Sequence, residues 1–265
     1  MAAAFANAKA AERPALMPYY TLGYPEMANS LDIISAIAPH ADLLELGVPF
    51  SDPLADGPTI QRSTQTALEN GTTVKKCLAA LQTLRQQGVE TPALLMGYYN
   101  PILAYGEEAF VRDAAEAGAD GFIVPDLPPE EADELEAVAA RYGLALIHFL
   151  APTSNAERIA AVTKRATGFI YLVSLTGITG ARAQVADDLG AFIGRVRQTS
   201  TVPLAVGFGI STAAQVAEIG RLADGVIVGS ALINAVDSAE PAHKAQAAAE
   251  FVRGLVSLSA SQSVS

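Results

Sequence analysis

Cysteine and histidine are scarce in this chain. Cys77 is the one cysteine, so neither an intramolecular disulfide nor a cluster of metal-binding thiolates can form. Its neighbours have a helical pattern, which predicts a packed, structural thiol. The three histidines, His40, His148 and His243, are too scattered for a metal-binding motif, and we predict no metal site. His148 lies in an apolar run, where a packed strand residue is favoured over a residue that approaches a site.

Long apolar runs and an excess of basic residues are also missing. No stretch approaches the roughly 20 apolar residues that a membrane span requires, and residues 1–13 lack the continuous apolar segment of a secretory signal. The formal net charge of -11 argues against nonspecific binding to nucleic acid. We therefore expect a cytoplasmic protein with neither nucleic acid nor membrane as a partner. A small anion remains a possible ligand, because backbone amides bind phosphate without a cation.

Apolar runs alternate with amphipathic helical segments along the whole chain, and 51% of its residues are hydrophobic. This order predicts a (β/α)8 TIM barrel, a single α/β domain over 1–265 with its core at about 15–258 and an extra N-terminal helix. A doubly wound open sheet is the alternative, but residues 23–25 are not the Gly-rich dinucleotide loop that such a sheet has after its first strand. The predicted strands cover residues 15–22, 42–48, 92–99, 121–125, 144–150, 168–174, 203–206 and 225–228, and the last helix covers about 240–258.

Glu45 interrupts the second apolar run. Alternation along a strand puts Leu43, Glu45 and Gly47 on one face and the larger aliphatic residues on the other, which suits the helix layer. Glu45 should therefore point into the barrel near its C-terminal end, where barrel enzymes have their active sites. An apolar cavity would raise the pKa of Glu45 and let it give and take a proton near neutral pH. The alternative is a structural carboxylate that accepts hydrogen bonds from backbone amides.

Asp56 follows in a loop that contains three prolines, Pro49, Pro53 and Pro58. Prolines stiffen a loop, which suits a residue that must stay within hydrogen-bond reach of a substrate. An Asx turn before the next glycine is an equally good interpretation of Asp56. For Asp52, in an ordinary turn sequence, we favour the turn.

Glycines follow the last three predicted strands, in residues 176–182, 207–211 and 229–231. Barrels often bind phosphate between the loops after strands seven and eight and the N-terminus of an added helix. The glycines together therefore favour a phosphate ester as ligand. Phe208 could line the pocket or pack under its loop, and Tyr171 could face the substrate or be a core residue. The residues alone thus predict a barrel enzyme with a Glu/Asp pair that acts on a small phosphorylated molecule without a metal or redox cofactor.

The segment 44–61, with the sequence LELGVPFSDPLADGPTIQ, resembles the signature of the tryptophan synthase alpha chain family. Matching segments recur after the other strands, so the resemblance covers nearly the whole chain except the alanine-rich N-terminus and the serine-rich tail. They are residues 18–25, 124–128, 176–182, 206–210 and 228–231.

The resemblance implies a lyase of tryptophan biosynthesis that cleaves indole-3-glycerol phosphate to indole and glyceraldehyde 3-phosphate by a retro-aldol reaction. In that reaction Glu45 would protonate indole C3 and take the proton of the glycerol 3′-hydroxyl. Asp56 would accept the indole N–H and stabilise the cation, and Thr179 would close on Asp56. The indole would lie among Tyr19, Ile60, Leu95, Tyr171 and Phe208, and the phosphate would bind Gly180, Gly209, Gly229 and Ser230.

The resemblance also implies a partner, the tryptophan synthase beta chain, in a heterotetramer of two alpha and two beta chains. The beta chain would hold pyridoxal phosphate, and this chain would need no cofactor. A stand-alone indole-3-glycerol phosphate lyase that releases free indole is the alternative. A catalytically silent scaffold and a sugar-phosphate isomerase on the same barrel are further rivals. The intact Glu45 and Asp56 argue against the scaffold, and the loop after strand two argues against the isomerase.

Overall fold

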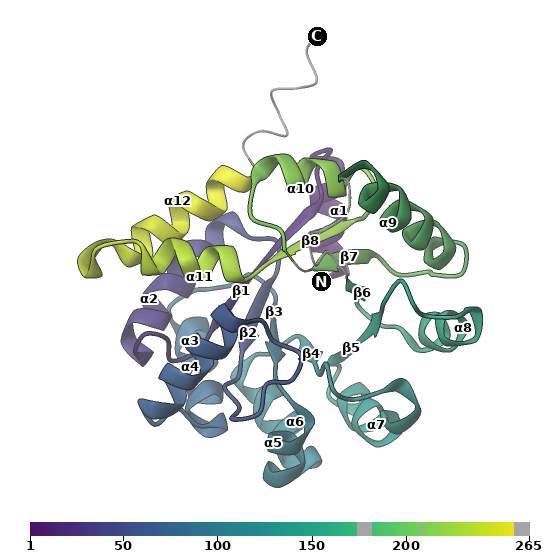
Figure 1. Cartoon of the computed structure of the whole chain (residues 1–265). Helices are drawn as coiled ribbons and strands as arrows, with labels where there is room; N and C mark the ends of the chain where they lie inside the picture. Colours follow the sequence, from purple (N-terminus) through teal and green to yellow (C-terminus); the bar gives the residue numbers. More distant parts are fainter. Residues whose placement is uncertain (174–181, 208, 257–265) are drawn as a thin grey trace.

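Eight parallel strands close into a barrel in the order β1 to β8 (Figure 1), which confirms the predicted (β/α)8 architecture. The computed structural model describes residues 1–173, 182–207 and 209–256, apart from the side chains of 182–187. The strands are β1 (Ala15–Thr21), β2 (Leu44–Gly47), β3 (Ala93–Met96), β4 (Gly121–Ile123), β5 (Ala145–Leu150), β6 (Ile170–Val173), β7 (Leu204–Gly207) and β8 (Gly225–Val228).

Helices surround the barrel as an outer layer (Figure 1). Two of them were not predicted, α5 and α11, because segments of seven and eight residues are too short to show a helical period. The single helix predicted over 240–258 is in fact a short 3-10 turn, η3, followed by α12. The helices are α1 (Ala2–Ala10), α2 (Met27–Ile37), α3 (Pro58–Glu69), α4 (Val74–Gln86), α5 (Tyr99–Tyr105), α6 (Glu107–Ala117), α7 (Asp133–Arg141), α8 (Ala156–Arg165), α9 (Arg182–Arg197), α10 (Ala213–Gly220), α11 (Ser230–Asp237) and α12 (Lys244–Val256), with 3-10 turns η1 (Ala38–His40), η2 (Pro129–Glu131) and η3 (Pro241–His243).

Alternation along the strands divides the apolar residues into two clusters. Leu43 and Leu94 belong to the cluster inside the barrel. Leu44, Leu46 and Leu95 belong to the larger cluster between the strands and the helices. Glu45 is two residues after Leu43 and points to the same side of β2, so its side chain lies inside the barrel as the sequence predicted.

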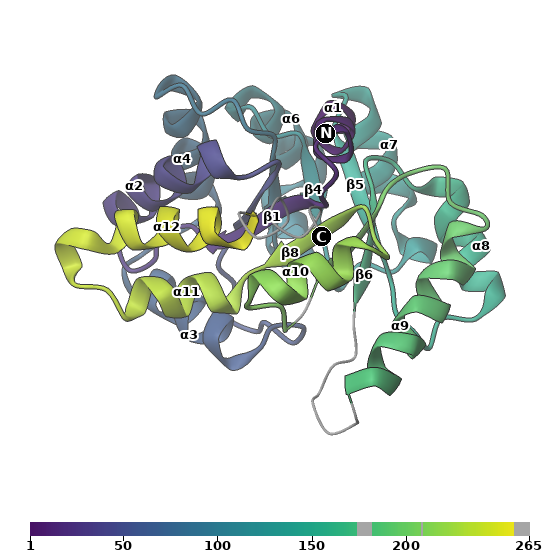
Figure 2. The same ribbon diagram turned by 90° about the horizontal axis from the view of Figure 1, so that it is seen from above.

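The extra N-terminal helix predicted from the sequence is α1, and it closes one end of the barrel. Phe5 and Ala8 are buried in the inner cluster, and the ring centroids of Phe5 and Phe169 lie 5.8 Å apart. In Figure 2, α1 lies on the side of the molecule opposite α3. The C-terminal ends of the strands therefore form the open end, where a ligand has access. Within the described ranges, no helix has both the length and the apolar character needed to cross a membrane.

Candidate active site

A cavity of about 470 Å³ opens at the C-terminal ends of the strands. Its residues come from the barrel interior, from the loops after β2, β4 and β7, from Gly229 after β8, and from helices α3 and α11. Glu45 and Asp56 both line it, so the two predicted acids share one cavity. Of the other predicted residues, those that also line it are Tyr19, Ile60, Tyr171, Gly209, Gly229 and Ser230.

Glu45 is a buried carboxyl group at the inner surface of the barrel. Its side chain is only 2% exposed, and its Oε2 has no hydrogen-bond partner among the residues that the structure describes. Burial raises the pKa of Glu45 to about 8, and the negative charge of Asp56 contributes to the rise. At neutral pH Glu45 is therefore mainly protonated, and one of its carboxyl oxygens has no partner among the described residues. This geometry contradicts the alternative of a carboxylate satisfied by backbone amides.

Asp56 lies in the loop that joins β2 to α3, and neighbouring groups hold this loop in place. The Asp56 amide donates to the Pro53 carbonyl oxygen at 3.1 Å, and Gln61 Nε2 donates to the Asp56 carbonyl oxygen at 2.8 Å. The adjacent Ala55 amide donates to Tyr98 Oη at 2.9 Å. Burial raises the pKa of Asp56 to about 6, while a hydrogen bond from the Tyr98 hydroxyl opposes the rise. Asp56 is thus mostly ionised at a pH where Glu45 is mostly protonated.

Asp52, in the same loop, is a turn residue, as favoured from the sequence. Its carboxylate accepts a hydrogen bond from Ser51 Oγ at 2.7 Å, and its carbonyl oxygen accepts one from the Leu54 amide at 2.9 Å. Asp52 is exposed and does not line the cavity.

Aromatic and aliphatic side chains line the cavity beside the acids. The ring centroids of Tyr171 and Phe149 lie 4.7 Å apart, and with Met96 these rings form an apolar surface next to Glu45. The predicted contact between Leu95 and the indole is wrong, because the Leu95 side chain points out of the barrel and packs in the helix layer. Met96, the next residue, faces the cavity instead.

Sequence reasoning missed Met96, Phe149 and Tyr98. Alternation applied to β3 and β5, as it was applied to β2, would have found Met96 and Phe149. Tyr98 follows β3, and no pattern in the chain indicates that its hydroxyl reaches the Asp56 loop.

Two glycines make room for the two tyrosines of the cavity. A Cβ built on Gly47 would lie 2.2 Å from Tyr19 Oη, and a Cβ built on Gly207 would lie 2.2 Å from Tyr171 Oη. Each tyrosine therefore passes over a glycine of the neighbouring strand, β2 or β7, in direct contact with its backbone. A side chain at either glycine would displace the ring.

A second group of cavity residues, after β7 and β8, is suited to an anion. Gly209 and Ser211 line it after β7, and Gly229 and Ser230 line it after β8. Ser230 is the first residue of α11, so the amides around it are at a helix N-terminus, where they lack intrahelical acceptors and carry partial positive charge. Thr179, Gly180 and Phe208, which were also predicted to contribute, lie outside the described residues.

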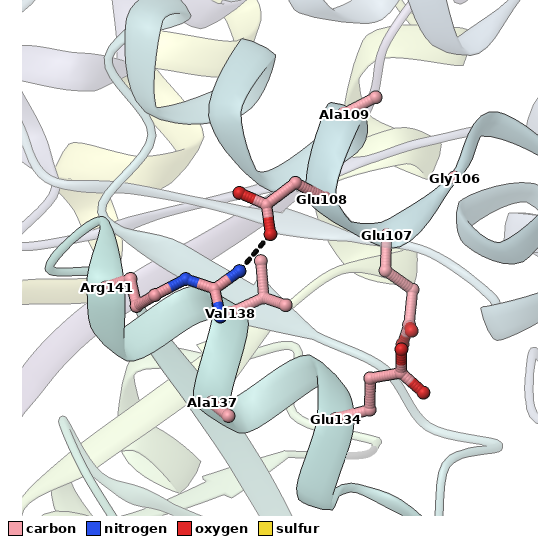
Figure 3. A pocket seen from close by; sticks show the side chains of 8 residues that line it. All are labelled: Gly106, Glu107, Glu108, Ala109, Glu134, Ala137, Val138 and Arg141. Carbon is pink, nitrogen blue, oxygen red and sulfur yellow. Dashed lines mark hydrogen bonds and ion pairs between the residues drawn. The ribbon is translucent and has the colours of Figure 1, made fainter.

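A second hollow of about 510 Å³ lies between α6 and α7, on the outside of the barrel (Figure 3). Tyr99 Oη donates to Glu107 at 2.8 Å, and Arg141 forms an ion pair with Glu108. Glu107 and Glu108 are therefore both bound to neighbouring side chains. The hollow shares no lining residue with the cavity of Glu45 and Asp56 and is a separate surface cleft between two helices.

Residues 5–260 match a family model described as the tryptophan synthase alpha chain. The chain belongs to this family. It is 56% identical to the tryptophan synthase alpha chain of Roseiflexus castenholzii over 94% of this chain and 96% of that one. Two solved structures have the same fold. The alpha subunit from Legionella pneumophila has a TM-score of 0.88 at 39% identity, covering 96% of this chain and 95% of that one. A tryptophan synthase structure from M. tuberculosis has a TM-score of 0.86 at 37% identity, covering 96% of each chain.

Membership confirms the predicted family, its place in tryptophan biosynthesis and its reaction. Members of the tryptophan synthase alpha chain family are lyases that cleave indole-3-glycerol phosphate to indole and glyceraldehyde 3-phosphate. Membership also implies a partnership with a tryptophan synthase beta chain.

Proposed function

We propose that Glu45 and Asp56 carry out the family reaction in this chain, with divided roles. The observation that supports this most directly is the buried Glu45 carboxyl group, which has an unpaired Oε2 and lines the same cavity as Asp56. Their different pKa values, about 8 and about 6, leave one acid protonated and the other ionised near neutral pH. Two carboxyl groups with separated pKa values are suited to acid–base catalysis.

The reaction begins when Glu45 transfers its proton to indole C3. C3 becomes tetrahedral, and the positive charge resides on the ring nitrogen, where ionised Asp56 accepts the N–H hydrogen bond. A charge-assisted hydrogen bond of this kind contributes about 1.5–3 kcal/mol. Glu45, now ionised, takes the proton of the hydroxyl on the carbon attached to C3. That carbon becomes the aldehyde as the electrons of its O–H bond form the C=O bond. The electrons of the breaking carbon–carbon bond restore the neutral indole ring, and the hydroxyl proton leaves Glu45 protonated again.

The remaining contacts place the substrate between its two ends. The indole would lie against Tyr19, Ile60 and Tyr171, with Met96 in the position first assigned to Leu95. The phosphate would bind the amides of Gly209, Gly229 and Ser230, and the Ser230 hydroxyl. Thr179, Gly180 and Phe208 keep their proposed roles in loop closure, phosphate binding and indole contact.

The partner would be a beta chain with pyridoxal phosphate, in a heterotetramer of two alpha and two beta chains in the cytoplasm. The loop of residues 49–58 would face this partner. Leu54 in that loop is 92% exposed, which is unusual for a large apolar side chain and supports a docking role. We further propose that residues 1–265 act as a single barrel domain.

The test is release of indole from indole-3-glycerol phosphate by the purified chain, with and without a beta chain. We expect slow release alone and faster release with the beta chain. Equal and fast rates would instead support a stand-alone lyase. A Glu45→Gln variant that cleaves at the parental rate would disprove the proposed roles.

A further inference from the structure

Three side chains that do not line the cavity meet one another, and they come from three separate segments. Tyr24 lies in the loop after β1, Arg62 in α3, and Asp237 at the end of α11. Tyr24 Oη donates to Asp237 Oδ1 at 2.6 Å, and Arg62 Nη1 donates to Tyr24 Oη at 2.8 Å. Arg62 Nη2 also forms an ion pair with Asp237 Oδ2. We call these three residues the clasp.

The clasp joins the two helices whose first turns line the proposed substrate site, one beside Asp56 and the other at the proposed phosphate site. Helix α3 starts at Pro58, directly after Asp56 and Gly57, and its Ile60 lines the cavity. Helix α11 starts at Ser230, where the phosphate would bind. The two helices lie side by side in both views (Figures 1 and 2). A shift of α3 relative to α11 would therefore change the distance between the indole end and the phosphate end of the site.

The hydroxyl of Tyr24 makes the clasp more than a surface ion pair. Tyr24 is only 6% exposed, so its hydroxyl group needs a partner inside the protein, and it donates a hydrogen bond to the Asp237 carboxylate. The Arg62 guanidinium also lies over the Tyr24 ring, 5.9 Å from its centroid. Because the side chains of Arg62 and Asp237 are 51% and 25% exposed, the ion pair alone adds little stability. Its main effect is geometric, since a donor on α3 (Arg62) and an acceptor on α11 (Asp237) both bind the hydroxyl group of Tyr24, which belongs to neither helix.

We propose that Tyr24, Arg62 and Asp237 are positioning residues that maintain the distance between Asp56 and the phosphate site at Ser230, and so set the length of substrate that the cavity accepts. This inference rests on the proposed function. The inference predicts that a change in the clasp affects ligands differently, according to the parts of the site that they contact. A ligand that contacts both ends depends on the distance between α3 and α11, whereas a ligand that contacts only the phosphate end does not.

The experiment compares two probes by calorimetry. Indole-3-propanol phosphate keeps the indole and phosphate groups but lacks the hydroxyls needed for cleavage, so it spans the site. Glycerol 3-phosphate occupies the phosphate end only. The variants are Arg62→Met, Asp237→Asn and their combination, together with Tyr24→Phe, which removes only the bridging hydroxyl. Arg158→Met is the matched control, because Arg158 forms a comparable ion pair with Glu130 away from the cavity.

We expect each clasp variant to raise the Kd of indole-3-propanol phosphate by about threefold to tenfold, since a shift of well under 1 Å already reduces complementarity. The Kd of glycerol 3-phosphate should change by less than twofold. The combined variant should lose no more than the single variants, because their effects report one interaction. A third probe is the analogue of indole-3-propanol phosphate with one more methylene. The ratio of its Kd to that of indole-3-propanol phosphate should fall toward one in the clasp variants and stay at the parental value in Arg158→Met.

Equal weakening of both probes would indicate a general structural role and overturn the inference. Unchanged binding of both probes, or the same change in Arg158→Met, would also overturn it. Failure of the proposed function would be visible in the parental protein itself, as the absence of indole-3-glycerol phosphate cleavage. That result would overturn this inference as well, whereas cleavage by the parent with unchanged clasp variants would overturn this inference alone.

Discussion

The substitution Glu45→Gln separates the catalytic and the electrostatic effects of one buried carboxyl group. Glutamine has nearly the same shape but no proton to give at any accessible pH. We expect cleavage of indole-3-glycerol phosphate to fall by at least about a hundredfold, the usual contribution of a general acid–base group. The same substitution should make the protein more stable at alkaline pH, because it removes a charge that would otherwise form in an apolar site.

The size of the stability effect follows from the raised pKa of Glu45. The folded protein keeps this proton up to about pH 8, whereas an unfolded chain loses it near the ordinary value of 4.5. Between these values unfolding releases a proton, so the free energy of unfolding falls as pH rises, by about 1.4 kcal/mol per pH unit. The parental protein should lose roughly 3 to 5 kcal/mol over this interval from Glu45 alone, the lower figure applying where water reaches the ionised carboxylate. Below pH 4.5 Glu45 is protonated in both states and contributes no pH dependence.

The assay is urea unfolding of the parental protein and Glu45→Gln at several values between pH 5 and pH 9. The difference between the two proteins removes the contributions of all other titrating groups that they share. We expect the difference in the free energy of unfolding to grow in favour of Glu45→Gln as pH rises, and to level off above about pH 8. A difference that stays constant across this range would refute the raised pKa and, with it, the role of Glu45 as the proton donor.

Three further predictions concern the same cavity. Asp56→Asn should lower kcat by one to two decades, about the value of one charge-assisted hydrogen bond, while glycerol 3-phosphate binding stays unchanged in calorimetry. The pH profile of kcat/KM should be bell-shaped, because activity needs ionised Asp56 above about pH 6 and protonated Glu45 below about pH 8; an alkaline limb that persists in Glu45→Gln would contradict this assignment. Gly47→Ala should destabilise the protein by about 1–3 kcal/mol in urea unfolding, because its Cβ would lie 2.2 Å from Tyr19 Oη, and adding Tyr19→Phe should restore part of the loss.

Much of the fold and part of the site could be predicted from the sequence. The apolar runs marked all eight strands, and alternation placed Glu45 inside the barrel. The same rule, had it been applied to β3, would have replaced Leu95 by Met96. Helices α5 and α11 were missed because a segment of one or two turns repeats its apolar face too few times to show a period.

The order of apolar runs by itself determined the barrel, and alternation along the second run determined that Glu45 points inward, whereas the sequence pattern left Asp56 open between a site residue and a turn residue. Only the tertiary structure decided their states of protonation, because a pKa depends on burial and on neighbours that are distant in the sequence. Tyr98, which donates a hydrogen bond to Asp56, is 42 residues away along the chain. The clasp shows the same dependence, since Tyr24 and Asp237 are separated by 213 residues and meet only because β1 and β8 close the barrel.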